Sequence, residues 1–222
     1  MFAVVLFAPQ MLNDGDTWSH IAVGRWIIAQ RAVPWTDPFS RTFAGAPWQA
    51  HEWLSEVMMA TAYQLSGVAG VLLLTGGAAA LTVGLLARHL LIWLAPQAAA
   101  IVLVFATVCG ASSLLARPHV LALPALELWV AGLAVARSRN TVPSFWLLPV
   151  MTLWANLHGG FAFGLALVLP FALEAVVANP AARWRTAGGW GLFLSGAFAA
   201  AILTPYGWHG LVLPVRLMLL QH

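Results

Sequence analysis

The chain has 222 residues, of which 61% are hydrophobic and only 8% are charged. Its mean hydropathy is +0.85, whereas charged residues make up about a quarter of soluble domains. This composition excludes an ordinary soluble domain and predicts a multi-pass membrane protein. Ten arginines and no lysine make the chain basic. They are scattered singly or in pairs rather than massed in one patch, so we exclude nucleic-acid binding.

The hydrophobic runs predict an all-α fold, a polytopic membrane helix bundle of about seven or eight spans. We expect residues 1–222 to form a single transmembrane domain. Met1–Leu12 is apolar, but a span requires about 20 residues, so we interpret this run as the outer part of a first helix. Because the sequence starts and stops within apolar runs, we expect it to be truncated at one or both ends.

Residues 13–56 carry five of the seven acidic residues and predict a long first extracytoplasmic loop with interfacial helices. Asp14 or Asp16 can cap a helix over roughly Thr17–Gln30, where apolar residues recur at three- and four-residue spacing. A stretch rich in proline and glycine follows and predicts turns. The segment Glu52–Ser66 is again predicted to be helical.

Six further apolar runs predict the remaining spans. They are residues 68–86, 97–115, 120–136, 142–157, 161–178 and 190–203. Arginines lie in alternate short loops between them, which the positive-inside rule assigns to the cytoplasm; they are Arg88, Arg137, Arg139, Arg183 and Arg185. The other loops should then face outward together, with five of the seven histidines and five of the seven acids.

Asp14 and Asp16 are the candidate catalytic residues, because the sequence Asp-Gly-Asp places two carboxylates beside a helix start. They can ligate a divalent cation such as Mg²⁺ or Mn²⁺ together with waters and substrate oxygens. One of them can instead accept a proton from an acceptor hydroxyl. The alternative is that they only cap the helix and favour its positive end. His20 lies one helical turn after Asp16 and can orient it or share a ligand, and we predict that it contacts substrate.

His51 and Glu52, followed by Glu56, resemble the start of a zinc-protease motif. The residue four positions after His51 is Ser55, so the second zinc ligand is missing and we exclude a zinc protease. We predict that His51 and Glu52 contact substrate. The alternative is an acidic first turn of the following helix, which the helix dipole favours.

Four polar residues at predicted span ends are further candidates for substrate binding. Arg117 and His119 flank Pro118, and an arginine there can hold a phosphate through paired, charge-assisted hydrogen bonds. Asn156 and His158 precede two glycines, which permit close backbone approach. The alternative for Arg117 is an arginine that snorkels to the membrane interface. The alternative for Asn156 and His158 is a helix cap followed by glycines that end the helix.

Glu127 lies inside a predicted span, where an ionisable side chain is costly and usually faces a partner or a cavity. It follows His119 by about two helical turns and can support the site from beneath. An ion pair with an arginine is the alternative.

The residues Asp-Gly-Asp-Thr-Trp-Ser-His-Ile-Ala-Val-Gly-Arg-Trp-Ile, with His-Glu-Trp-Leu-Ser-Glu further along, resemble the first outer loop of bacterial membrane glycosyltransferases of the GT-C superfamily. Protein O-mannosyltransferases, aminoarabinose transferases and oligosaccharyltransferase catalytic subunits are related. Supporting matches are Arg117-Pro118-His119 and Asn156-Leu157-His158-Gly159. The resemblance implies a module of about seven spans that takes a sugar from a polyprenyl phosphate or pyrophosphate carrier on the outer face.

The resemblance also implies roles for individual residues. In such enzymes an acidic residue of the first outer loop activates the acceptor or helps to bind a divalent metal, and Asp14 and Asp16 match that place. The phosphate of the donor would meet Arg117, together with His119 or His158. The implied location is the bacterial inner (plasma) membrane, with the active face extracytoplasmic.

We therefore expect a cell-envelope glycosyltransferase whose partners are the lipid bilayer and a polyprenyl-phosphate sugar donor. Two alternatives stay open. One is a transporter or flippase for a lipid-linked or anionic solute, in which Glu127 and Arg117 line the pathway. The other is a non-catalytic membrane assembly subunit.

Overall fold

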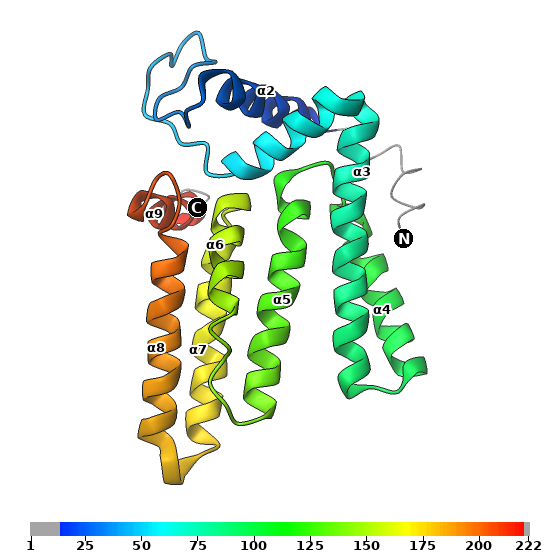
Figure 1. The fold of residues 1–222 in the computed structure, drawn as a ribbon, viewed down its shortest axis with the longest axis vertical. Coiled ribbons are helices and arrows are strands. Elements are labelled where there is room, and N and C mark those ends of the chain that lie inside the picture. The colour runs from blue at the N-terminus through cyan, green and yellow to red at the C-terminus, as the bar shows by residue number, and fades with distance from the viewer. Residues whose placement is uncertain (1–13, 220–222) are drawn as a thin grey trace. The chain divides into compact units, whose positions relative to one another are not determined.

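The structure is a computed structural model that describes residues 14–219, and its regular elements are helices (Figure 1). The all-α prediction is confirmed for these residues, whereas the predicted first span, Met1–Leu12, lies outside them. The helices are α2 (Gly15–Gln30), α3 (Trp53–Trp93), α4 (Pro96–Gly110), α5 (Pro118–Ser138), α6 (Leu147–Leu157), α7 (Phe161–Val177), α8 (Arg183–Ala201) and α9 (Trp208–Leu219), with short 3₁₀ turns at Ala111–Ser113 and Pro180–Ala182.

The chain divides into two compact units, Met1–Pro124 and Ala125–His222. The first unit contains α2, α3, α4 and the beginning of α5. The second contains the rest of α5 and α6 to α9.

Helix α2 begins where the sequence predicts a cap. Asp14 has an extended backbone, and its side chain accepts a hydrogen bond from the backbone nitrogen of Asp16 at 3.1 Å. Asp14 is therefore the capping residue. The helix ends at Arg31, whose left-handed backbone (φ 52°) stops it from continuing.

The predicted turns follow α2 and end at the start of α3. The carboxylate of Asp37 accepts hydrogen bonds from the backbone nitrogens of Phe39 and Ser40, which is the local turn that aspartate favours. An isolated β-bridge between Thr36 and Pro47 closes the loop.

Helix α3 has 41 residues and would rise about 60 Å if straight, twice the thickness of a hydrocarbon core. Its helical geometry is interrupted at Ser66 and at Gly67, which has a φ of 59° that glycine adopts readily. The interruption separates the predicted helix that starts near Glu52 from the predicted span that starts at Val68. Figure 1 shows the first part of α3 running beside α2 before the helix turns.

The contact between α2 and the first part of α3 is close because Gly24 has no side chain. A Cβ atom at Gly24 would lie 2.0 Å from the backbone oxygen of Glu56 and 2.8 Å from the Cβ of Ala60. Buried Val23 and Ile27 complete the apolar side of this contact. The two helices can therefore approach until their backbones nearly touch.

The second unit is organised around Trp129, which is fully buried in α5. Its indole Nε1 donates a hydrogen bond to the backbone oxygen of Gly164 at 2.8 Å, and its ring stacks on Phe193 at 5.5 Å between centroids. A Cβ atom at Gly164 would lie 2.4 Å from the ring of Trp154. These aromatic side chains join α5, α6, α7 and α8.

The predicted number of spans, seven or eight, is wrong for the described residues. Two helices, α3 and α5, are long and apolar enough to cross a membrane. Helices α7 and α8 are together long and apolar enough as well, with a bend of 105° between them. If they are counted as one broken span, the number of candidate spans is three.

Two of the predicted spans fail because the apolar runs at 97–115 and 142–157 are longer than the helices that form within them. Helix α4 has 15 residues and α6 has 11, which correspond to rises of about 22 and 16 Å, less than the roughly 30 Å of a hydrocarbon core. The run at 142–157 loses its first residues to a non-helical segment that contains Pro143, since proline disfavours helical geometry in the residue before it.

We expect Gly24→Ala to lower the free energy of unfolding by about 1–3 kcal/mol, because the added methyl group must push α2 away from α3. Thermal unfolding of the detergent-solubilised protein measures the change. Gly15→Ala is the matched control, since a Cβ at Gly15 in the same helix meets nothing within 4 Å. Equal melting temperatures for the two variants would contradict the close contact.

Candidate functional site

Arg117, the residue before α5, connects that helix to the start of α2. Its Nη2 donates to Oδ1 of Asp14 at 2.7 Å and to Oδ2 of Asp16 at 2.6 Å, and its Nε contacts the other oxygen of Asp14. The hydroxyl of Thr17 donates to the backbone oxygen of Ala116 at 3.0 Å, in a buried contact beside this ion pair. Residues 103 positions apart in the sequence are thereby joined.

The two predicted catalytic aspartates differ in their surroundings. The Asp14 side chain is only 10% exposed, and both of its oxygens contact Arg117 while one also caps α2. The Asp16 side chain is 60% exposed. Asp14 thus holds the arginine in place, and Asp16 is the carboxylate of the pair that a ligand can reach.

His20 lies between two further carboxylates, which come from the start of α3. Its Nδ1 is 3.2 Å from Oε1 of Glu56, and its Nε2 is 3.8 Å from Oε2 of Glu52. His51 extends the group, with its Nε2 3.8 Å from Oε1 of Glu52. We name the seven residues Asp14, Asp16, His20, His51, Glu52, Glu56 and Arg117 the polar cluster.

The charges within the polar cluster act on His20 and Glu52. Burial lowers the pKa of His20, but the hydrogen bond with Glu56 and the negative charges of Glu52, Glu56 and Asp16 outweigh it, so the pKa is raised above its ordinary value of 6.5. Burial raises the pKa of the Glu52 carboxyl above 4.5, against the opposing charges of His51 and His20. The two glutamates thus favour the protonated imidazolium.

Glu56 is a member of the cluster that the sequence prediction missed. It is 4% exposed, and its Oε2 is buried without a hydrogen-bond partner among the described residues. The spacing of Glu52 and Glu56 is the signal that could have identified it, since residues four apart near a helix start lie on the same face. Its proximity to His20, 36 residues earlier, depends on the packing of two helices.

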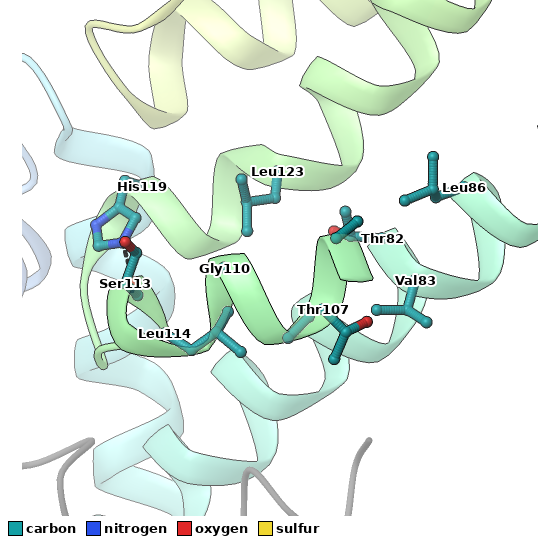
Figure 2. A pocket seen from close by; sticks show the side chains of 11 residues that line it. Thr82, Val83, Leu86, Thr107, Gly110, Ser113, Leu114, His119 and Leu123 are labelled. Carbon is teal, nitrogen blue, oxygen red and sulfur yellow. Dashed lines mark hydrogen bonds between the residues drawn. The ribbon is translucent and has the colours of Figure 1, made fainter. Parts of the chain in front are cut away.

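His119 lies at one end of an apolar cavity of about 230 Å³ between α3, α4 and α5 (Figure 2). Its Nε2 donates to the backbone oxygen of Ser113 at 2.7 Å. The cavity is otherwise lined mainly by aliphatic side chains and two threonines, among them Thr82, Val83, Leu86, Thr107 and Leu123. The structure therefore gives His119 an apolar neighbourhood and a backbone partner, and its predicted contact with a phosphate stays a prediction.

Asn156 and His158 belong to the second unit, where both bond to the backbone. The amide of Asn156 donates to the carbonyls of Thr152 at 2.8 Å and Leu203 at 3.0 Å. His158 follows the end of α6, and its Nδ1 accepts from the backbone nitrogen of Gly160 at 2.9 Å. These bonds fit the structural alternative for the two residues, and their role in substrate binding stays a prediction.

The aspartate pair as arranged does not fit a protein-held divalent cation. Both oxygens of Asp14 already accept from Arg117, and one oxygen of Asp16 does so as well. Within residues 14–219, no three His, Cys, Asp or Glu side chains are grouped so that they could hold a metal ion. A cation between Asp14 and Asp16 would have to displace the guanidinium.

Comparison with known proteins finds no matching family, no matching curated protein and no matching solved structure. The chemistry of the polar cluster is therefore the main guide to function. The cluster combines one guanidinium, two imidazoles and four carboxylates in the first unit. Such a group can bind an anion at one end and accept a proton at the other.

We expect Arg117→Ala to lower the free energy of unfolding by about 1–3 kcal/mol, because the mostly buried Asp14 carboxylate loses its charged partner. Arg41→Ala removes the same charge from an exposed loop position and should leave the melting temperature close to that of the wild type. An Arg117→Ala melting temperature equal to that of Arg41→Ala would show that the ion pair contributes nothing to stability.

The raised pKa of His20 predicts a pH-dependent contribution to stability. A folded-state pKa above the unfolded value means that the contribution is fully present below pH 6.5 and is lost as the pH rises through the folded-state pKa. The difference in unfolding free energy between wild type and His20→Gln should therefore be larger at pH 5.5 than at pH 9. Chemical denaturation at several pH values measures it, and a difference that grows with pH would contradict the assignment.

Proposed function

We propose that the chain is a membrane glycosyltransferase that moves a sugar from a polyprenyl-phosphate-linked donor to an acceptor on the extracytoplasmic face of a bacterial plasma membrane. The observation that carries the proposal is the juxtaposition of Arg117 with Asp14, Asp16 and the His20–Glu56 pair. A transfer of this kind requires a cation beside the leaving phosphate and an anionic or basic group beside the acceptor. The polar cluster offers both.

Arg117 is the residue that would meet the phosphate of the donor. Its bonds to the aspartates use Nε and Nη2 and do not involve Nη1. A guanidinium held on one side by carboxylates keeps its planar fork oriented for a phosphate on the other side. Asp14 would then act by positioning Arg117.

Asp16 is the carboxylate that would meet the acceptor. Its side chain is largely exposed, and one of its oxygens is anchored by Arg117. A carboxylate in this position can orient an acceptor hydroxyl by accepting its hydrogen bond. The resemblance of the loop sequence to GT-C enzymes supports the same place for the acidic centre, and the apolar helices α3 and α5 suit a lipid-linked donor.

We expect Asp16→Asn to reduce the initial rate of sugar transfer by about 10- to 100-fold, because one charge-assisted hydrogen bond is lost beside the reacting groups. The assay follows radiolabelled sugar from a panel of polyprenyl-phosphate donors in membranes that contain the protein. Asp37→Asn is the matched control, since it makes the same change in the same loop outside the polar cluster. Added EDTA tests whether the transfer depends on a divalent cation such as Mg²⁺ or Mn²⁺.

The outcomes separate the proposal from its alternatives. If the wild type transfers sugar and the rate falls in Asp16→Asn but not in Asp37→Asn, the result would support the proposed role of Asp16. No transfer from any donor by a folded wild-type protein would refute the glycosyltransferase. A protein that tolerates these substitutions and purifies with a partner would favour an assembly subunit.

A transporter for an anionic solute is the second candidate, and Glu127 favours it. This carboxyl group lies within the candidate span α5, and its Oε1 is buried without a hydrogen-bond partner among residues 14–219. An unpaired ionisable group within a span often marks a solute or proton pathway. Accumulation of an anionic solute in proteoliposomes, abolished in Glu127→Gln, would support transport.

A further inference from the structure

The sugar transfer proposed above needs a group that removes the proton of the acceptor hydroxyl. His20 is a strong candidate because it lies four residues after Asp16 on α2 and contacts the start of α3. Its side chain is 19% exposed, so it is held by its surroundings and still reached by solvent. A histidine with one ring nitrogen fixed and the other available is a common arrangement for a general base.

We infer that His20, held in orientation by Glu56, accepts the proton of the acceptor hydroxyl through its Nε2 atom. This role rests on the proposed function. It divides the polar cluster into a phosphate end, formed by Arg117 with Asp14, and an acceptor end, formed by His20 with Glu56 and Glu52. The exposed Asp16, which bonds to Arg117 and would orient the acceptor hydroxyl, lies between the two ends.

The contacts of the ring decide which nitrogen is available. An ionised carboxylate only accepts hydrogen bonds, so Nδ1 of His20 carries the proton that is donated to Oε1 of Glu56 at 3.2 Å. In the neutral ring Nε2 is then unprotonated. Glu52 Oε2 lies 3.8 Å from Nε2, too far for a hydrogen bond but close enough to stabilise the imidazolium that forms.

Glu56 is suited to a positioning role because it is buried and its side chain bonds to His20. Its Oε2 has no hydrogen-bond partner in the described part of the chain, so the ion pair with His20 is the interaction seen to compensate its burial. The backbone of Glu56 is fixed by the close approach of Gly24. The direction of Nε2 is therefore set by packing as well as by charge.

The aspartates are less available as proton acceptors than His20. Both oxygens of Asp14 and one oxygen of Asp16 already accept charge-assisted bonds from Arg117. A proton on these oxygens would weaken their hydrogen bonds with Arg117 during the step in which the guanidinium must stabilise the leaving phosphate. A proton on His20 is instead favoured by Glu52 and Glu56.

The acceptor O–H bond breaks and its proton passes to Nε2 of His20, while the acceptor oxygen forms a bond to the anomeric carbon of the sugar. The bond between that carbon and the phosphate oxygen breaks, and its electron pair stays on the lipid phosphate beside Arg117. The imidazolium then returns its proton to solvent.

The pH dependence of transfer follows from the groups around His20, which are Asp16 on α2 and Glu52 and Glu56 at the start of α3. They hold the pKa of His20 above 6.5 despite its burial. The unprotonated base therefore accumulates as the pH rises through that raised value. The rate should rise with pH over the same range.

The first experiment measures initial rates of transfer from pH 5.5 to 9 for wild type, Glu56→Gln and Glu174→Gln. Glu56→Gln should lower the rate. It should also move the acid limb of the pH–rate profile, where the rate rises with pH, to lower pH, because the carboxylate that favours the imidazolium is gone. Glu174→Gln makes the same change at an exposed carboxylate that pairs with Arg137 in the second unit and should leave the profile unchanged. A merely structural Glu56 would lower the rate without moving the limb.

The second experiment tests the base itself by chemical rescue. His20→Ala should lose about 100-fold or more of the rate, the usual contribution of a general base, and added imidazole should restore part of it. Imidazole should not stimulate the wild type or His89→Ala, which removes a histidine from the span part of α3. Circular dichroism and gel filtration of each variant establish that it is folded.

Failure of this inference is distinguishable from failure of the proposed function. A folded His20→Ala variant that transfers sugar at the wild-type rate would overturn the role of His20. An acid limb of the pH–rate profile that stays in place in Glu56→Gln would overturn it as well. Both results would leave the proposed glycosyltransferase activity standing. Loss of the rate in His20→Ala without rescue by imidazole, together with an unmoved limb, would also overturn it. Absence of transfer by the wild type from every donor would refute both.

Discussion

The close approach of α2 to the first part of α3 is the constraint on which the polar cluster depends. Gly24 lies directly against the backbone of Glu56, and His20, one turn earlier in α2, thereby comes within hydrogen-bond distance of the Glu56 carboxylate. A larger residue at Gly24 would separate the helices and the two polar groups together. Packing and electrostatics are thus coupled through one residue without a side chain.

Arg117 adds a second connection, between the start of α2 and the start of α5. Its bonds with Asp14 and Asp16 fix the start of α2. The contact between His20 and Glu56 fixes the same helix one turn further along. Because α2 is held at both places, the exposed Asp16 and the partly exposed His20 are presented from a rigid element. Such rigidity favours a site whose groups must be placed accurately relative to a substrate.

The apolar runs show why hydropathy alone did not predict the number of membrane spans. Hydropathy measures how well a segment tolerates hydrocarbon, but the length of a helix depends on local breaks. Gly67 divides α3 as the sequence suggested. Helices α4 and α6 are nevertheless shorter than the apolar runs that contain them, and α7 and α8 are separated by a bend of 105°. The number of spans was overestimated for this reason.

Two roles were predicted for Asp14, and the structure confirms the first of them, the helix cap. Its position before a helix predicted a cap, and its pairing with a second carboxylate predicted an active-site residue. In the structure Asp14 caps α2 and also holds Arg117. Asn156 and His158 were predicted from span-end positions, and the bonds described for them are to the backbone. Their role in substrate binding, like the catalytic role of Asp14, stays a prediction.

The sequence by itself determined the all-helical character of the described residues, a helix cap at Asp14 or Asp16, the turns that follow α2 and, to within two residues, the start of α5. These features depend on hydropathy, backbone preferences and contacts within a few residues. Only the tertiary structure decided that Arg117 pairs with Asp14 and that His20 pairs with Glu56, across 103 and 36 residues. The reason is physical, since such pairs form only where helix packing brings distant segments together, and no local pattern encodes that distance.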